Sequence, residues 1–202
     1  MLRTLIGIFL GTCGLVANAQ TGFQIQTIAG SNYAGDGPSA ASAILQQAEG
    51  VAVATDGTLY IADATDHRIR AIAPTGEIRT VAGDGTAGGD GDGGPAAKAH
   101  LNSPYGLSMD RQGNLYIADL GNARIRMINP RGVISTVAGG GEIAAAESSE
   151  GSQATDLKFK SPRNVLADPN GGFYFYFSDF DAHRVYFVDF RGILTVFAGT
   201  GT

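Results

Sequence analysis

The sequence contains one cysteine, no tryptophan and no run of lysine or arginine. The cysteine, Cys13, lies near the start, so the chain cannot form an internal disulfide and depends on packing for its stability. With 14 basic and 19 acidic residues, the formal net charge is −5. A protein of this charge without basic clusters is poorly suited to the nucleic-acid backbone. We therefore expect no nucleic-acid partner.

The chain also lacks an apolar run long enough to cross a bilayer, which takes roughly 20 residues. The apolar stretch from Leu5 to Val16 follows Arg3 and precedes Ala17-Asn18-Ala19. This is the pattern of a secretory signal peptide with a small-residue cleavage site. We expect residues 1–19 to be a signal peptide cleaved after Ala19, no membrane span, and a secreted or periplasmic mature protein. A retained anchor and a lipidated Cys13 are the alternatives.

No window shows a sustained 3.6-residue period, so helix is confined to short alanine runs. The chain contains an internal repeat instead. Residues 35–70 match residues 91–126 without a gap after a shift of 56, including Tyr-Ile-Ala-Asp at 60–63 and 116–119. A looser third copy shares Ser-Pro at 161–162. Self-similarity at this period is typical of propellers and solenoids.

Each copy divides into short strands separated by turns. In the second copy the strands are GLSMD, NLYIAD, ARIRMINP and VISTVAG, and the turns are RQG, LGN and PRG. Four short antiparallel strands make one blade of a β-propeller. The sequence therefore predicts an all-β partial propeller with three four-stranded blades. We expect blades at 50–83, 106–139 and 164–199, linkers at 31–49, 84–105 and 140–163, and one extra leading strand at 23–30.

The second copy, LNSPYGLSMDRQGNLYIADLGNARIRMINPRGVISTVAG (101–139), resembles an NHL repeat. The GDGGPA linker (91–96) is similar to that of bacterial secreted NHL-repeat proteins. The resemblance covers nearly all of the chain after residue 19. It implies a propeller, usually of six blades, that most often serves as a recognition surface.

This chain departs from the family in supplying three blades. The apolar faces at the two ends of the arc are then open. We expect the chain to be a piece of a longer propeller. The alternative is a homodimer, in which two copies close a six-bladed ring through their ends.

The glycine-rich linker around Asp90 and Asp92 is a candidate ion or phosphate site, and Asp36 is the equivalent of Asp92 in the first copy. A calcium loop needs further oxygen ligands at fixed positions, and a phosphate loop needs a Lys-Ser/Thr pair. Both are missing from this linker. We interpret it as a structural turn and expect no cofactor and no metal ligands.

In every copy an aspartate at the end of one strand precedes, by five residues, an arginine that opens the next. The carboxylate can accept N–H groups of the turn and pair with the guanidinium. We expect these pairs to be structural clasps. They are Asp63–Arg68, Asp119–Arg124 and Asp179–Arg184.

Antiparallel strands place the long linkers and the Asp–Arg turns on one face, which we call the loop face. Aromatic and arginine side chains dominate recognition hot spots, and histidines can ligate metals. No third metal ligand aligns with the two histidines, and ordinary linker packing is the alternative for the others. The candidate ligand contacts on this face are Tyr33, His67, Tyr105, Arg163 and His183.

We therefore expect a secreted, non-catalytic module that binds a protein, peptide or glycan through the loop face. The sequence shows no Ser-His-Asp arrangement and no conventional metal spacing, so no catalytic residue is assigned. The alternative is a fragment of a six-bladed propeller enzyme, lactonase-like or lyase-like, with a metal at the central axis. Fold resemblance alone does not decide between the two.

Overall fold

The computed structural model describes residues 35–37, 39–145, 151–168, 170 and 174–201. In this part of the chain the regular structure consists of strands and short 3-10 turns. No helix in the described ranges has the length and apolar character that a bilayer crossing requires. The predicted signal peptide at 1–19 and the predicted strand at 23–30 lie outside the described residues.

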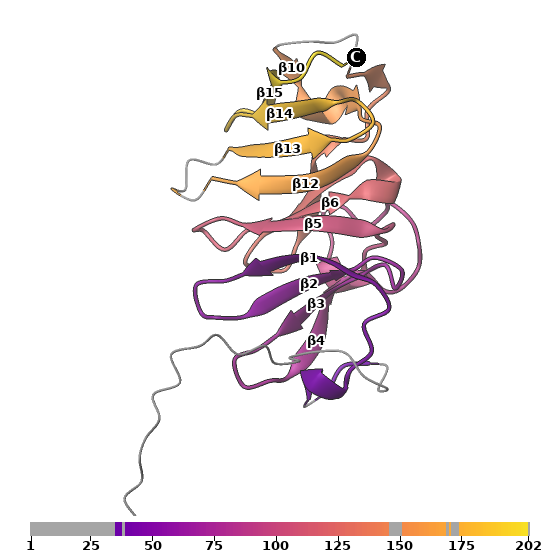
Figure 1. Cartoon of the computed structure of the whole chain (residues 1–202), viewed down its shortest axis with the longest axis vertical. Helices are drawn as coiled ribbons and strands as arrows, with labels where there is room; N and C mark the ends of the chain where they lie inside the picture. The colour runs from indigo at the N-terminus through magenta and orange to yellow at the C-terminus, as the bar shows by residue number, and fades with distance from the viewer. Residues whose placement is uncertain (1–34, 38, 146–150, 169, 171–173, 202) are drawn as a thin grey trace, which may run out of the picture.

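The strands form three antiparallel sheets, each in sequence order, which we call blades 1 to 3 (Figure 1). Blade 1 consists of β1 (Ala48–Val53), β2 (Leu59–Asp63), β3 (Arg68–Ile72) and β4 (Ile78–Ala82). Blade 2 consists of β5 (Pro104–Met109), β6 (Leu115–Asp119), β7 (Arg124–Ile128) and β8 (Ile134–Gly139). Blade 3 consists of β12 (Pro162–Ala167), β13 (Phe175–Asp179), β14 (Arg184–Val188) and β15 (Ile193–Ala198). The predicted all-β fold of four-stranded antiparallel blades is confirmed.

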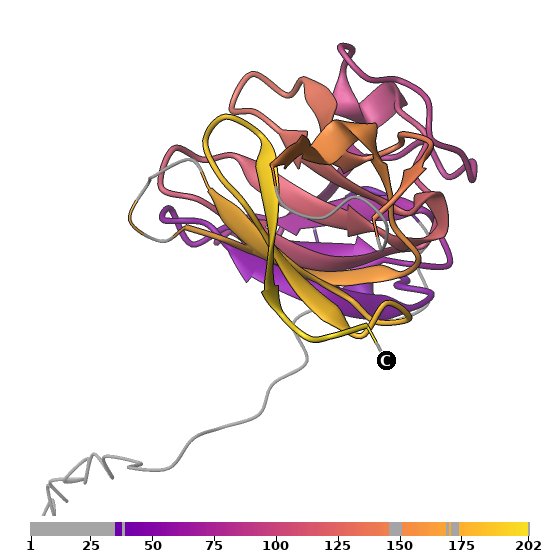
Figure 2. The same cartoon turned by 90° about the horizontal axis from the view of Figure 1, so that it is seen from above.

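The innermost strands of the three blades are β1, β5 and β12, which lie side by side in the middle of the molecule (Figure 1). Seen from above, blade 3 lies in front of blades 1 and 2 (Figure 2). Each innermost strand begins two residues before the predicted start of its blade, because the residues after the linker already pair with the second strand. The pairs Ala48–Asp63, Pro104–Asp119 and Pro162–Asp179 show this.

The linkers contain short elements of their own. Each linker has a 3-10 turn: η1 (Ala40–Ser42), η2 (Ala96–Lys98) and η4 (Ala154–Asp156); η3 (Leu120–Asn122) lies in a turn of blade 2. In the third linker, β9 (Ile143–Ala144) pairs with β11 (Leu157–Lys158), and β10 (Ser152–Gln153) joins the outer edge of blade 3 beside β15. The sequence predicted this linker as irregular, so these three short strands are an addition.

The core lies between the blades, and the linkers supply part of it. Ala96, Ala99 and Leu101 are fully buried between two sheets. One side of this cluster is Ala62, Ile69 and Ala82 of blade 1, and the other is Ile117, Ile128 and Ile134 of blade 2. Burying a leucine side chain contributes about 1.5–3 kcal/mol. We call such a linker segment a wedge, because it fills the space between neighbouring blades.

Candidate functional site

Buried arginines on the third strands hold the glycine-rich linkers in place. Arg126 is fully buried and donates to the Asp92 carboxylate at 2.5 Å and to the His100 carbonyl at 2.9 Å. Burial opposes ionisation of Asp92, but hydrogen bonds from Thr136 and Arg126 outweigh it and keep the pKa below its usual value. In blade 1, Arg70 donates to Asp36 at 3.0 Å. These contacts give both linker aspartates a structural partner.

The aspartates and arginines that the sequence pairs as clasps bind other groups in the structure. Asp63, Asp119 and Asp179 do lie opposite Arg68, Arg124 and Arg184 in the strand register. Within the described residues, however, none of the three pairs forms an ion pair. The arginine side chains reach outward past the turn, and each donates to a backbone carbonyl. The acceptors are Asp84 at 2.6 Å, Gly89 at 3.1 Å and Thr200 at 3.2 Å.

The three carboxylates are buried and accept backbone N–H groups where each linker enters its blade. These N–H groups lie at a bend and have no strand partner, so the carboxylate satisfies them. The donors are Gln46 and Gln47 to Asp63 at 3.1 and 2.9 Å, Asn102 to Asp119 at 2.8 Å, and Lys160 and Ser161 to Asp179 at 2.9 and 2.8 Å. The aspartates thus bind the backbone of the linkers, and not the arginines with which the sequence paired them.

Asp119 lies among several hydrogen-bond donors and a buried arginine. It accepts hydrogen bonds from the Asn102 N–H and the Asn122 amide, both at 2.8 Å, and Arg126 Nη1 lies 3.7 Å away. Burial raises the pKa of Asp119 to about 6, although these hydrogen bonds and the nearby arginines oppose the shift. The folded protein therefore takes up a proton at Asp119 at a higher pH than the unfolded chain does.

We expect this proton uptake to stabilise the fold as the pH falls from 7 to 5. The pKa of Asp119 is about 6 in the folded state and 3.8 in the reference state. Between these values the folded state binds more protons, so its stability rises as pH decreases, by at most about 1.4 kcal/mol per pH unit. Urea titrations at pH 7, 6 and 5 measure the slope. Asp119→Asn should abolish it, and a slope that survives this substitution contradicts the assignment.

A row of side chains crosses the loop-face end of the three innermost strands. Glu49, Tyr105 and Arg163 occupy equivalent positions on β1, β5 and β12. The Arg163 guanidinium carbon lies 4.0 Å from the ring centre of Phe180 and 5.7 Å from that of Tyr105. A hydrogen bond and the negative charge of Glu49 raise the pKa of Tyr105. We call these four residues the axial row.

Arg163 is the unusual member of the axial row. No carboxylate of the described chain lies within ion-pair distance of it, and its Nε is buried without a hydrogen-bond partner. Phe180, against which it stacks, is 54% exposed. Aromatic rings thus orient the guanidinium, and no carboxylate in the described part of the chain pairs with it.

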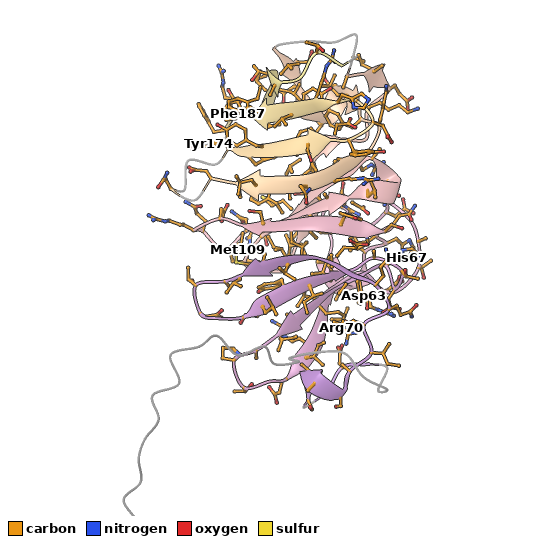
Figure 3. All side chains as sticks on the ribbon, viewed as in Figure 1. Asp63, His67, Arg70, Met109, Tyr174 and Phe187 are labelled. Carbon is orange, nitrogen blue, oxygen red and sulfur yellow. The ribbon has the colours of Figure 1, made fainter. Side chains whose placement is uncertain are left out.

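The structure brings together two of the five predicted contact residues. Tyr105 and Arg163 meet in the axial row, whereas Tyr33 lies outside the described residues. His67 is used within the fold, because its Nδ1 accepts the Ser103 N–H at 3.1 Å. His183 occupies the same turn of blade 3, two blades away (His67 is labelled in Figure 3). In the described ranges, no group of three or more His, Cys, Asp or Glu residues is arranged to hold a metal.

The sequence reasoning missed Glu49 and Phe180. Glu49 could have been found by the repeat, because it aligns with Tyr105 after the shift of 56 residues. Phe180 follows Asp179 directly, at the place taken by Ala64 and Leu120 in the other copies. A large aromatic residue at a position that is aliphatic elsewhere was the available signal.

Comparison with known proteins places these features in context. The model of the teneurin NHL domain matches residues 13–88 and 84–149. Human Teneurin-4 is 42% identical over 100 residues, which is 43% of this chain and 4% of that protein. SUPPRESSOR OF QUENCHING 1, chloroplastic, from Arabidopsis thaliana is 38% identical over 90 residues, which is 44% of this chain and 8% of that protein. The chain thus spans less than a tenth of either relative.

Solved structures share the fold at low identity. A chain of the Nidogen/Laminin complex superposes with a TM-score of 0.53 at 16% identity, over 77% of this chain and 49% of that one. A gluconolactonase from Xanthomonas campestris superposes with a TM-score of 0.53 at 18% identity, over 76% of this chain and 47% of that one. At these identities the likeness concerns the fold alone.

Proposed function

Because the chain belongs to the family of the teneurin NHL domain, a family of NHL-repeat β-propellers, we propose that it is an exported recognition module that binds a protein or peptide through its loop face. The match of the family model to more than half of the chain supports a binding role in general. The axial row supports the more specific proposal. Three members of the row are half-buried and Phe180 is exposed. A row of partly exposed side chains across three strands is suited to a peptide segment better than to a small substrate, which usually binds in a deep pocket.

The observation that carries the proposal is the guanidinium of Arg163, which has no ion-pair partner among the described residues. Its stacking on Phe180 and Tyr105 limits its freedom before a ligand arrives, so less entropy is lost on binding. A planar guanidinium pairs with a carboxylate through two parallel hydrogen bonds. We therefore expect an acidic side chain or a chain terminus of the partner to contact Arg163. Glu49, at the other end of the row, is suited to a basic group.

The catalytic alternative has less support from the described residues. A metal at the central axis would need carboxylate or histidine ligands that converge from several blades. The three loop-face aspartates, Asp63, Asp119 and Asp179, instead accept backbone N–H groups of the linkers. The superposition with a gluconolactonase concerns the fold and does not supply these ligands.

We expect peptides selected on the immobilised chain from a random display library to be rich in acidic residues and to depend on Arg163. Arg163→Ala should weaken their binding at least about tenfold, as for a hot-spot residue. Arg163→Lys should also weaken it, because an ammonium lacks the stacked, two-pronged geometry. Titration calorimetry with the selected peptides measures both changes.

The matched control is Arg131→Ala. Arg131 is exposed in the tight turn between β7 and β8, on the face opposite the loop face, and its removal changes the net charge equally. This variant should bind the peptides like the original chain. Equal weakening by both variants would show that only net charge matters, and unchanged binding by Arg163→Ala would place the site elsewhere.

A further inference from the structure

Blade 1 packs on blade 2 in the same way as blade 2 packs on blade 3, and we call each of these contacts between neighbouring blades a seam. We call the face of a blade that turns toward the next blade its trailing face, and the opposite one its leading face. At the first seam the trailing face receives the wedge of Ala96, Ala99 and Leu101. At the second seam Ala118, Ile125 and Ala138 share a cluster with the wedge of Ala154, Leu157 and Phe159. A trailing face therefore accepts a wedge from the linker that follows it.

The innermost strands also meet in a repeated way. At the second seam the Ser108 hydroxyl accepts the N–H of Ala167 at 3.0 Å. At the first seam the equivalent residues, Ala52 and Met109, pack on one cluster. The central residue of one innermost strand, Ala52 or Ser108, thus faces a residue near the end of the innermost strand of the next blade, Met109 or Ala167.

The trailing face of blade 3 has the same form but nothing covers it within the described chain. Ala198 is exposed, whereas its equivalents Ala82 and Ala138 are fully buried. Phe197 and Leu166 are 64% and 61% exposed. Four rings lie together on this face, with centroids 4.9–6.1 Å apart (Tyr174 and Phe187 are labelled in Figure 3). They are Tyr174, Tyr176, Phe187 and Phe197.

The leading face of blade 1 is also uncovered within the described chain. Val51 is 60% exposed, whereas its equivalents Leu107 and Val165 are 8% and 6% exposed. The first linker forms a wedge whose inner side, Ala40 and Ala43, packs on blade 1. Among the described residues its outer side meets no other blade, and Leu45 is partly exposed where the equivalent Leu101 is fully buried.

We propose that these two faces dock on each other in a second copy of the chain, so that two copies close a ring of six blades. Blades 1 and 3 lie at opposite ends of the arc and cannot meet within one copy (Figure 1). A twofold pairing gives each trailing face a wedge and each wedge a trailing face, so both seams form at once. A second copy suits both faces, because the described residues include one wedge that contacts a single blade and one trailing face that receives no wedge.

The existing seams also predict which residues meet. Leu166 is the equivalent of Ser108 and Ala52, and Val53 is the equivalent of Ala167 and Met109. Leu166 of one copy therefore lies opposite Val53 of the second copy. Both side chains are apolar and more than 60% exposed in the single copy, so their contact removes a substantial apolar area from water.

One position makes the new seam looser than the existing two. Gly50 and Gly106 allow the next innermost strand to come close, since a Cβ at Gly50 would lie 2.1 Å from the Tyr105 carbonyl oxygen. Blade 3 has Asn164 at this place. The innermost strands of the two copies therefore meet less closely, and Asn164→Gly should strengthen the pairing.

The test is the mass of the full chain in solution by light scattering coupled to gel filtration, at several micromolar concentrations. The chain used is the full sequence of 202 residues. We expect the mass of two chains. Leu166→Lys alone and Val53→Glu alone should each give the mass of one chain, whereas the double variant should restore the dimer, because lysine then lies opposite glutamate in both seams.

Thermal melting followed by circular dichroism shows that each variant is folded, which is expected because both side chains are exposed in the single copy. Asn164→Gly should lower the dissociation constant of the dimer. A single-chain mass for the unchanged protein at every concentration overturns the proposal. A dimer that persists in Leu166→Lys and Val53→Glu also overturns it, since the contact would then lie elsewhere.

Discussion

Replacing Arg126 by alanine should lower the free energy of unfolding by about 3–5 kcal/mol, the usual cost of removing one partner of a buried ion pair. The guanidinium is fully buried and holds three groups at once: the Asp92 carboxylate, the His100 carbonyl and, at 3.7 Å, the Asp119 carboxylate. Its removal leaves the buried Asp119 carboxylate with the hydrogen bonds from Asn102 and Asn122 but without its ion-pair partner in the described chain. Urea unfolding followed by circular dichroism measures the loss.

The matched control is Arg70→Ala in blade 1. Arg70 is equally enclosed, but its partner Asp36 has a side chain that is 51% exposed and can be solvated by water after the substitution. We therefore expect a smaller loss of about 1.5–3 kcal/mol, the range for hydrogen bonds that involve a charge. Equal losses in the two variants would show that the buried contact with Asp119 contributes nothing.

The blades could be predicted from the sequence because they depend on local and periodic information. The shift of 56 residues identifies equivalent positions, and alternation with turn residues identifies the strands. The role of Leu101 as an apolar anchor follows from the same comparison. Periodicity does not show that the wedges of the second and third linkers each contact two blades, because those contacts join residues far apart in the chain.

The partners of the buried aspartates could not be predicted in this way. Asp119 and Arg124 are opposite each other in the register, so an ion pair was the natural expectation. The outcome depends on which N–H groups remain unpaired at the linker bend, and that is settled by the path of the linker in space. The ion pair of the linker aspartate did leave a trace in the sequence: Arg126 and Asp92 are both replaced in the third copy, by Tyr186 and Glu150.

Replacing Gly50 by alanine should lower the free energy of unfolding by about 3 kcal/mol or more, at the upper end of the cost of overpacking. The added Cβ would lie 2.1 Å from the Tyr105 carbonyl oxygen and 3.0 Å from the Gly106 Cα. These are backbone atoms of β5, which cannot rotate away as a side chain can. The two innermost strands must therefore separate, which opens the first seam and moves Tyr105 out of the axial row. Thermal and urea unfolding measure the loss.

The chain offers a graded series at this one position. In Gly106→Ala the Cβ would lie 2.6 Å from the Arg163 carbonyl oxygen, which is farther than the 2.1 Å at Gly50. The loss of stability should therefore be smaller than for Gly50→Ala but still above about 1 kcal/mol. Asn164 occupies the third equivalent position and is exposed, so Asn164→Ala should change the stability of the single copy by less than about 0.5 kcal/mol. The expected loss of stability decreases in the order Gly50, Gly106, Asn164, because the backbone of the next innermost strand lies nearest to Gly50 and no such strand lies beside Asn164 in the described single copy. A loss at Asn164 equal to that at Gly50 would show that the position matters for strand conformation and not for the distance between blades.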